Sequence, residues 1–389
     1  MIAYNSVSLD NKLVQEQAAE ALAKNCITAE DNTRIRAAYP VDFYSPNIYI
    51  RIGLIILCAI IVTFSVGLLY LITSPGSSDT GVGILWIFCG FICYGVLEAM
   101  IYGKKHFRSG VDDALLWMAG TLILAGISLA NYRIAALSLF LLAFVLAFYF
   151  TLRFADRLMA LVAYGALLAC LFKMMTALGG LGNQLLPFLI MAVSVAVYFL
   201  AASLSANPKL RHYHAGTILI KAASLLSFYL AGNYFVVREL SVALLDLPLQ
   251  PGQSLPLGWL FWILTIVTPF AYIYQGIRKK DAVFLWVGLA LVAAAVFTIR
   301  SYYHVLPIEW ALVLGGILLI AVSYALIKYL RIPRNGFTGE LSDDRHLLQN
   351  LHVESLIIAE TLSTTAPTPS NDFRFGGGSG GGGGAGGEF

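Results

Sequence analysis

The sequence predicts an all-α protein, a polytopic bundle of about ten helices that cross a membrane. Hydrophobic residues make up 59% of the 389 residues and charged residues only 12%, whereas a soluble domain has about 25% charged residues. The apolar residues also fall into runs of about 20, the length of helix that crosses the hydrocarbon core of a bilayer. Most of the surface must therefore face lipid, and the expected partner is the lipid bilayer itself.

Ahead of the bundle, residues 1–49 predict a small cytoplasmic helical hairpin, with two short helices within residues 10–39. Asn25 suits a left-handed helix end, where few other side chains are tolerated. Thr28 and Asp31, three positions apart, form a capping-box pattern that predicts the start of the second helix.

The transmembrane bundle is expected over residues 50–329. Its third and fourth segments are separated only by residues 131–133, so these two helices are expected to form an antiparallel hairpin. The ten apolar segments cover residues 50–73, 82–102, 111–130, 133–151, 157–176, 184–204, 215–237, 257–276, 282–300 and 308–329.

The positive charges between the segments predict the orientation. Ten Lys and Arg lie in the even-numbered connections and four in the odd-numbered ones, and such residues are retained on the cytoplasmic side. We therefore expect the even connections and both termini in the cytoplasm, and the bundle in a bacterial inner (plasma) membrane. Three of the cations lie in the loop 103–110, and Asp112 or Asp113 is expected to cap the helix that follows it.

Two segments follow the bundle. Residues 330–365 include "DDRHLLQNLHVESLIIAETL", which has the pattern of a cytoplasmic amphipathic helix. Residues 366–389 form a Gly-rich tail that has no apolar run able to pack against a core, and disorder is expected there.

The stretch "GKKHFRSGVDDALLWMAG" has a partial echo later in the chain, "GIRKKDAVFLWVG". A basic cluster precedes both, and the tryptophans differ by one position. Two parallel-oriented repeats, of segments 1–4 and 7–10, would explain the echo; chance similarity between apolar helices with basic flanks is the alternative. The aligned pairs are Asp113 with Asp281, Ala114 with Ala282, and Gly120 with Gly288.

The two ends of the chain resemble a known family. "AEALAKNCITAEDNTRIRAAYP" is similar to the N-terminal unit of a family of uncharacterised bacterial membrane proteins, a domain of unknown function in which two helices precede a multi-span bundle. "SYYHVLPIEWALVLGGILLIAVSYALIKYLRIPRNGFT" resembles the last span of the same group. The family usually has Gly at the turn where this chain has Asn25. The resemblance implies the architecture and brings no activity with it.

The sequence lacks the motifs of common membrane enzymes. The sequence has no HExxH for a metalloprotease and no GxSxG nucleophile elbow. The five cysteines include no CxxC pair, and "HYH" at 212–214 has no carboxylate or thiol nearby in sequence. We therefore predict no enzymatic activity, no metal and no cofactor. The small net charge of +3 likewise predicts no nucleic-acid partner.

Two ionisable residues lie inside predicted spans, where charge is costly and frequently functional. Glu98 lies about one turn from the cytoplasmic end of the second span, and Lys221 about two turns into the seventh. Their similar depth makes an intramembrane ion pair geometrically possible. Snorkelling of both side chains to the interface is the alternative.

A second candidate site lies on the outer side, as a cluster that would line a wide-mouthed cavity for an anionic or polar ligand. An aromatic belt with a stray Arg is the alternative interpretation. The cluster consists of Arg133, Arg300, Tyr302, Tyr303, His304 and Glu309.

Two functions remain open from the sequence. Transport or permeation of a small solute is favoured by the many short-looped spans, the small residues within them and the possible repeat. The absence of a Pro/Gly-broken helix pair at mid-membrane argues against it. The alternative is a membrane-embedded scaffold or sensor that recruits protein partners through its cytoplasmic termini.

Overall fold

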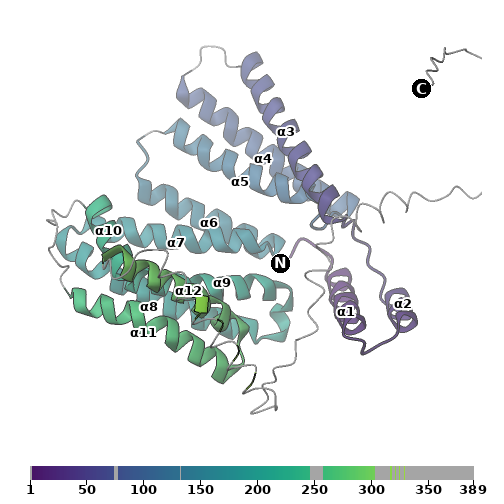
Figure 1. The fold of residues 1–389 in the computed structure, drawn as a ribbon. Helices are drawn as coiled ribbons and strands as arrows, with labels where there is room; N and C mark the ends of the chain where they lie inside the picture. Colours follow the sequence, from purple (N-terminus) through teal and green to yellow (C-terminus); the bar gives the residue numbers. More distant parts are fainter. Residues whose placement is uncertain are drawn as a thin grey trace, which may run out of the picture. The chain divides into compact units, whose positions relative to one another are not determined.

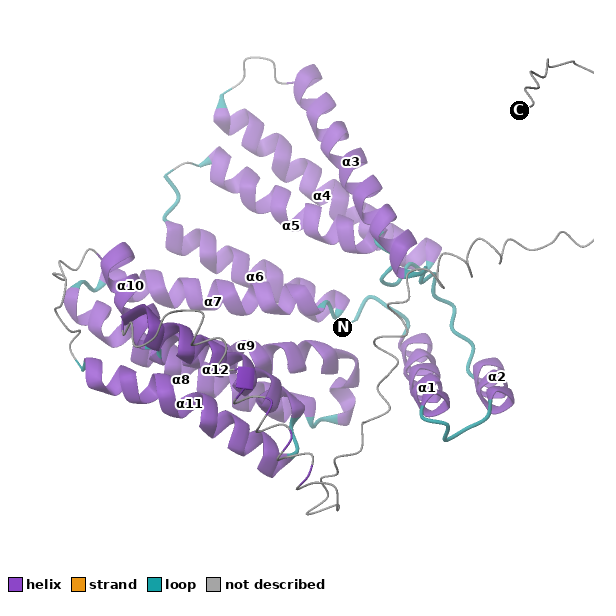
Figure 2. Cartoon of the chain, in the orientation of Figure 1, coloured by secondary structure: helices purple, strands orange, loops and turns teal. Residues whose placement is uncertain are grey.

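The computed structural model describes residues 2–73, 78–131, 133–245 and 257–302, together with a few separate positions between 316 and 328. Within these residues the regular structure is helical, apart from one isolated β-bridge between Tyr44 and His106 (Figures 1 and 2). The tenth predicted span (308–329), the segment 330–365 and the Gly-rich tail lie outside the continuously described residues.

Nine helices of the described part are long and apolar enough to cross a membrane, and the chain is a multi-pass membrane protein. The prediction of helical spans is thus confirmed for nine of the ten segments. The helices are α3 (Ile48–Thr73), α4 (Asp79–Lys104), α5 (Val111–Ala130), α6 (Ala136–Phe154), α7 (Arg157–Ala177), α8 (Gly180–Ser205), α9 (His214–Gly232, continuous with the 3-10 turn η1, Pro208–Tyr213), α11 (Gly258–Lys279) and α12 (Ala282–Tyr302).

The seventh predicted span, 215–237, ends later in the sequence than the helix does in the structure. Helix α9 stops at Gly232, and a separate helix α10 (Tyr234–Leu245) begins one residue later. Asn233 between them is extended, and its Oδ1 accepts the backbone N–H of Val236 at 3.1 Å. An Asn side chain that satisfies the first turn of a new helix favours an interruption over a continuous helix.

The N-terminal helices are α1 (Ser6–Ala23) and α2 (Ala29–Ala38). The predicted capping box is present: Thr28 Oγ1 accepts the N–H of Asp31 at 3.1 Å, and Asp31 Oδ2 accepts the N–H of Thr28 at 3.2 Å. Asn25 has the expected left-handed backbone, with φ 55°. Helix α1 starts earlier than predicted because Asn5 Oδ1 accepts the N–H of Val7 at 2.9 Å and caps it.

Antiparallel neighbours form most of the contacts between the membrane helices, in the pairs α4–α5, α6–α7, α8–α9 and α11–α12. Figure 1 shows α4 and α5 side by side along their length. Two glycines allow this close approach: a Cβ on Gly83 would lie 2.3 Å from the backbone N of Ala130, and one on Gly126 would lie 2.7 Å from the carbonyl O of Gly83. Small residues permit such backbone contact between helices in a membrane.

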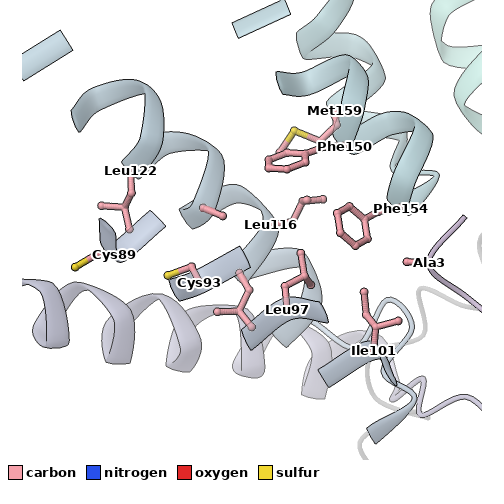
Figure 3. Close-up of a cluster of buried hydrophobic side chains, with 12 residues drawn as sticks. Ala3, Cys89, Cys93, Leu97, Ile101, Leu116, Leu122, Phe150, Phe154 and Met159 are labelled. Atoms are coloured by element: carbon pink, nitrogen blue, oxygen red, sulfur yellow. The ribbon is translucent and has the colours of Figure 1, made fainter. Parts of the chain in front are cut away.

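The largest buried cluster lies among α4, α5 and α6, and two side chains from outside these helices, Ala3 and Met159, complete it (Figure 3). Cys89 and Cys93, one turn apart on α4, are buried here as packing residues. The cluster also contains Leu97, Ile101, Leu115, Leu116, Ala119, Leu122, Phe150 and Phe154.

Two sets of three helices share a packing scheme. In the first triplet (α3, α4, α5) the third helix packs mainly on the second and next on the first; in the second triplet (α9, α11, α12) the same order holds. In both, the second helix ends at a left-handed lysine, Lys105 with φ 53° and Lys280 with φ 54°. This scheme agrees with the predicted repeat. The full repeat, which includes the tenth span, stays a prediction.

Candidate functional site

The connection between α4 and α5 is folded by its own acidic residue. Asp112 accepts the N–H of Arg108 at 2.7 Å and the N–H of Ser109 at 2.8 Å, and it also accepts the Ser109 hydroxyl at 2.9 Å. These donors precede the helix, so Asp112 orders the loop. The predicted side-chain cap of α5 by Asp112 or Asp113 is therefore wrong, because the N-cap position belongs to Gly110, but both acids lie in the first turn as predicted, at the positive end of the helix dipole.

Gly110 brings this loop against α3. Its φ is +98°, and a Cβ there would lie 2.3 Å from the carbonyl O of Arg51, so only glycine fits without rearrangement. The close approach places the Arg51 guanidinium on the Asp113 carboxylate, with Nη2 and Oδ2 2.7 Å apart. The first turn of α5 is thereby tied to the first turn of α3.

A cavity of about 770 Å³ opens between α3, α5, α7 and α9 next to this ion pair. Its charged lining residues all come from the start of a helix or from the loop before it, so they gather at one end. The remaining described lining residues are apolar, including Ile52, Ile55, Trp117, Ile218 and Ala222. The charged residues are Arg51, Arg108, Asp113, Asp156 and Arg157.

We call the end of the bundle that carries connections 105–110, 155–156, 206–213 and 280–281 the basic end. At this end Asp156 caps α7 by accepting the N–H of Met159 at 2.7 Å. Burial, together with the positive charges of Arg157 and Arg51, lowers the pKa of Arg108. A guanidinium still keeps its proton at neutral pH, so the charged end of the cavity holds three arginines in mutual range.

The N-terminal segment covers the basic end. The N–H of Ala3 donates to the carbonyl O of Arg153 at 2.8 Å, and the Tyr4 ring lies edge-on to Phe107, with centroids 4.9 Å apart. Arg211 Nε donates to Asp10 Oδ1 at 2.8 Å. A second cavity of about 240 Å³ lies beneath α1. Burial lowers the pKa of Lys12 on its wall.

The predicted pairing of Glu98 with Lys221 is wrong, because each residue has a nearer partner. Arg153 on α6 binds the Glu98 carboxylate with two nitrogens, Nε at 2.9 Å and Nη2 at 3.0 Å. Lys221 Nζ lies 3.1 Å from Asp281 Oδ2 at the start of α12. The sequence indicated that both charges lie at a similar depth in the membrane. Depth alone does not determine which helix lies beside each of them.

The outer cluster is only partly described: Tyr303, His304 and Glu309 lie outside the described residues, so its function as a ligand site stays a prediction. Tyr302 packs edge-on against Tyr234, with centroids 5.2 Å apart, and the Arg238 guanidinium lies 5.3 Å from its ring centroid. These contacts favour an aromatic belt for Tyr302. Arg133 and Arg300 lie at the end opposite the basic end, as the alternation of helices requires.

Sequence reasoning missed two buried polar clusters. Asn233 Nδ2 donates to the Tyr229 hydroxyl at 3.0 Å and to Thr298 Oγ1 at 2.9 Å, which joins α9 to α12. The Tyr164 hydroxyl lies 2.5 Å from Ser227 Oγ and 3.2 Å from Ser194 Oγ. The sequence shows these clusters only as single polar residues within apolar runs. Such residues look the same whether they are hydrogen-bonded inside the bundle or face the lipid.

The fold and the cavity define a multi-pass membrane protein with an open cavity that is charged at one end. Comparison with protein-family models, with curated proteins and with solved structures gave no match for this chain. The resemblance of the two ends to a bacterial membrane-protein family stays a prediction, and function has to be argued from the cavity.

Proposed function

We propose that this protein transports a small solute, or lets one permeate, through the cavity between α3, α5, α7 and α9. The observation that carries the proposal is the position of this cavity. Its walls include α3 and α9, which are the first helices of the two triplets. Substrate sites of many transporters lie between internal repeats, where one unit can move against the other.

The ion pairs within the triplets support independent movement of the two units. Arg51 at the start of α3 pairs with Asp113 at the start of α5, and Lys221 on α9 pairs with Asp281 before α12. In both triplets a cation of the first helix binds an acid at the start of the third. Each pair holds its own triplet together, and neither pair joins the two triplets.

The helix interruption at Asn233 adds support. Sequence reasoning counted the absence of a Pro/Gly-broken helix pair against transport; in the structure α9 gives way to α10 at Asn233, while α8 and α11 run continuously through Pro187 and Pro269. Interrupted helices expose backbone groups near a substrate path in many transporters. We place the basic end on the cytoplasmic side of a bacterial inner membrane, following the distribution of Lys and Arg.

The scaffold alternative has weaker support. The N-terminal segment that would recruit a partner binds the basic end of its own bundle, through Ala3 with Arg153 and Asp10 with Arg211. Those polar groups are thereby engaged within the chain. Of the two termini that the scaffold alternative invokes, only the N-terminal one lies within the described residues, so the C-terminal part of that alternative stays a prediction.

Reconstitution into liposomes tests the proposal. Vesicles are loaded with a panel of small carboxylates, phosphates, amines and sugars, and efflux is compared with that of protein-free vesicles. We expect faster efflux for one chemical class. Ala222→Trp should abolish it by filling the cavity, whereas Leu226→Trp, an exposed position on the same helix, should leave it intact. Equal leakage of every class, or no effect of Ala222→Trp, contradicts the proposal.

A further inference from the structure

The cavity has two chemically different ends, one charged and one apolar. We propose that it binds an amphipathic anion, with a phosphate or carboxylate head against Arg108 and Arg157 and an apolar chain along α3 and α9. The inference rests on the proposed function, since it takes the same cavity as the substrate site. Binding can nevertheless be measured without any flux.

The charged end has cations in excess. Three arginines and two carboxylates line it. Arg51 is neutralised by Asp113, at 2.7 Å, and the Asp156 carboxylate accepts a backbone N–H of α7. Within the part of the chain that the structure describes, neither Arg108 nor Arg157 forms an ion pair. Glu16 and Asp156 act on Arg108 only at longer range than an ion pair. A phosphate or carboxylate would supply a direct partner, and its oxygens match the forked donors of a guanidinium.

The Arg108 side chain is held in place by its surroundings. Its backbone is left-handed, with φ 50°, and its N–H is bound to Asp112 at 2.7 Å. The guanidinium lies 5.3 Å from the centroid of the Phe107 ring, in cation–π range. Arg157 stands at the first residue of α7 and faces the same cavity. A preorganised cation loses little freedom when an anion binds.

The wall beyond the charged end suits a hydrocarbon chain. On α3 the lining residues continue from Arg51 through Ile52 and Ile55 to Ala59, and eight residues of helix span about 12 Å. On α9, Ile218 and Ala222 face them. A sugar or a free inorganic ion would lose hydration along this wall without gaining hydrogen bonds. An apolar chain should gain roughly fourfold in affinity for each buried CH₂ group.

The test uses the full-length protein in phosphatidylcholine nanodiscs. Brominated alkyl phosphates with chains of four, eight and twelve carbons are titrated, and quenching is read from Trp117 on the cavity wall. Trp117→Phe identifies the part of the signal that comes from the cavity. We expect binding that tightens with chain length. Arg108→Gln and Arg157→Gln should each weaken it by about tenfold or more.

Matched variants separate the site from general effects. Arg278→Gln removes an exposed arginine of the basic end that does not line the cavity, and it should leave binding unchanged. Ala59→Phe should weaken the longest chain most, because it shortens the apolar wall, whereas Ile60→Phe, its exposed neighbour, should not. Arg108→Lys keeps the charge and should retain part of the affinity, which distinguishes lost recognition from misfolding.

Three results would overturn the proposal. The first is binding of inorganic phosphate with the same affinity as dodecyl phosphate, which indicates a plain anion site. The second is equal quenching by a brominated dodecyltrimethylammonium, which indicates unspecific partitioning. The third is absence of quenching. Nanodiscs that contain phosphatidic acid identify the source of the ligand. If phosphatidic acid competes with the alkyl phosphate, the natural ligand is a membrane lipid; if it does not compete, the ligand is a free amphiphile. Both results uphold the proposed class of ligand.

Failure of this inference differs from failure of the proposed function. Alkyl phosphate binding without flux of any solute upholds the inference and contradicts transport. Flux of a polar solute, blocked by Ala222→Trp but without alkyl phosphate binding, upholds transport and contradicts the inference.

Discussion

The two triplets share a packing scheme, but their first helices, α3 and α9, differ in how far they are buried. In the first triplet, all 26 described residues of α3 keep part of their surface exposed, and Arg51, near its start, has 30% of its side chain exposed. In the second triplet, α9 contributes buried residues such as Ser224 and Tyr229, and the Lys221 side chain is only 14% exposed. The cation of the second pair is therefore the more buried one, whereas the two acids, Asp113 and Asp281, are about equally exposed, at 18% and 22%.

The difference indicates unequal mobility. A helix without fully buried residues is held by fewer contacts than one that contributes several, and local stability follows buried contacts. Helix α3 is thus the wall of the cavity that we expect to move, and α9 the wall that stays. The predictions below follow from this asymmetry, in order of decreasing effect.

The largest effect is expected from the ion pair with the more buried cation, Lys221 with Asp281. Asp281→Asn keeps an acceptor for the N–H of Val283 but leaves Lys221 without its counter-charge, which should destabilise the fold by about 3 kcal/mol. Asp113→Asn should cost less, about 1 kcal/mol, because the Arg51 side chain left without its partner is 30% exposed and water reaches it. Thermal unfolding in detergent measures both. A larger loss for Asp113→Asn would reverse the comparison.

Gly110→Ala should cost about 2 kcal/mol or more, since the added Cβ meets the Arg51 carbonyl at 2.3 Å in a left-handed backbone. Its control is Gly103→Ala on α4, where a Cβ meets nothing within 4 Å and helix propensity should rise by up to about 1 kcal/mol. The same unfolding assay reports both. Equal behaviour of the two variants would mean that the loop does not hold α3.

Asn233→Ala should destabilise the second triplet by about 1–2 kcal/mol, because it removes the bonds to Tyr229 and Thr298 in a buried site. Hydrogen exchange should show the loss on α9 and α12, with α3 and α4 unchanged. Exchange that rises uniformly along the chain would show that the triplets do not behave as separate units.

The smallest effect concerns the two left-handed lysines. Lys105→Gly and Lys280→Gly should each stabilise the fold, by about 0.5–1 kcal/mol, because glycine adopts positive φ without strain. Similar gains at both positions would sharpen the parallel between the triplets. A loss at one of them would show that its side chain matters more than its backbone.

The sequence predicted the nine described membrane helices because their length and hydropathy are dictated by the bilayer, without any tertiary information. It also predicted the capping box at Thr28 and the left-handed Asn25, since both are local. The helix break at Asn233 could not be predicted, because one polar residue barely changes the mean hydropathy of a segment of about 20 residues. The partners of Glu98 and Lys221 escaped because depth along the membrane normal says nothing about which helix is the lateral neighbour.

The cavity was beyond sequence reasoning for a related reason. Arg51, Arg108 and Arg157 are separated by about fifty residues each in the chain, and each taken alone looks like an ordinary orientation charge. Only the packing of α3, α5, α7 and α9 shows that three such charges share one space. Basic residues that set topology and basic residues that bind a ligand have the same appearance in a sequence.

The covering of the basic end by the N-terminal segment has a consequence for biosynthesis. Ala3 binds Arg153 and Asp10 binds Arg211, which is 201 positions later in the chain. At about 5–20 residues per second, the ribosome needs roughly 10–40 seconds to deliver that arginine after the aspartate. Residues 3–10 are therefore synthesised long before their partners and reach their place late, and until then the basic end of the nascent chain stays uncovered.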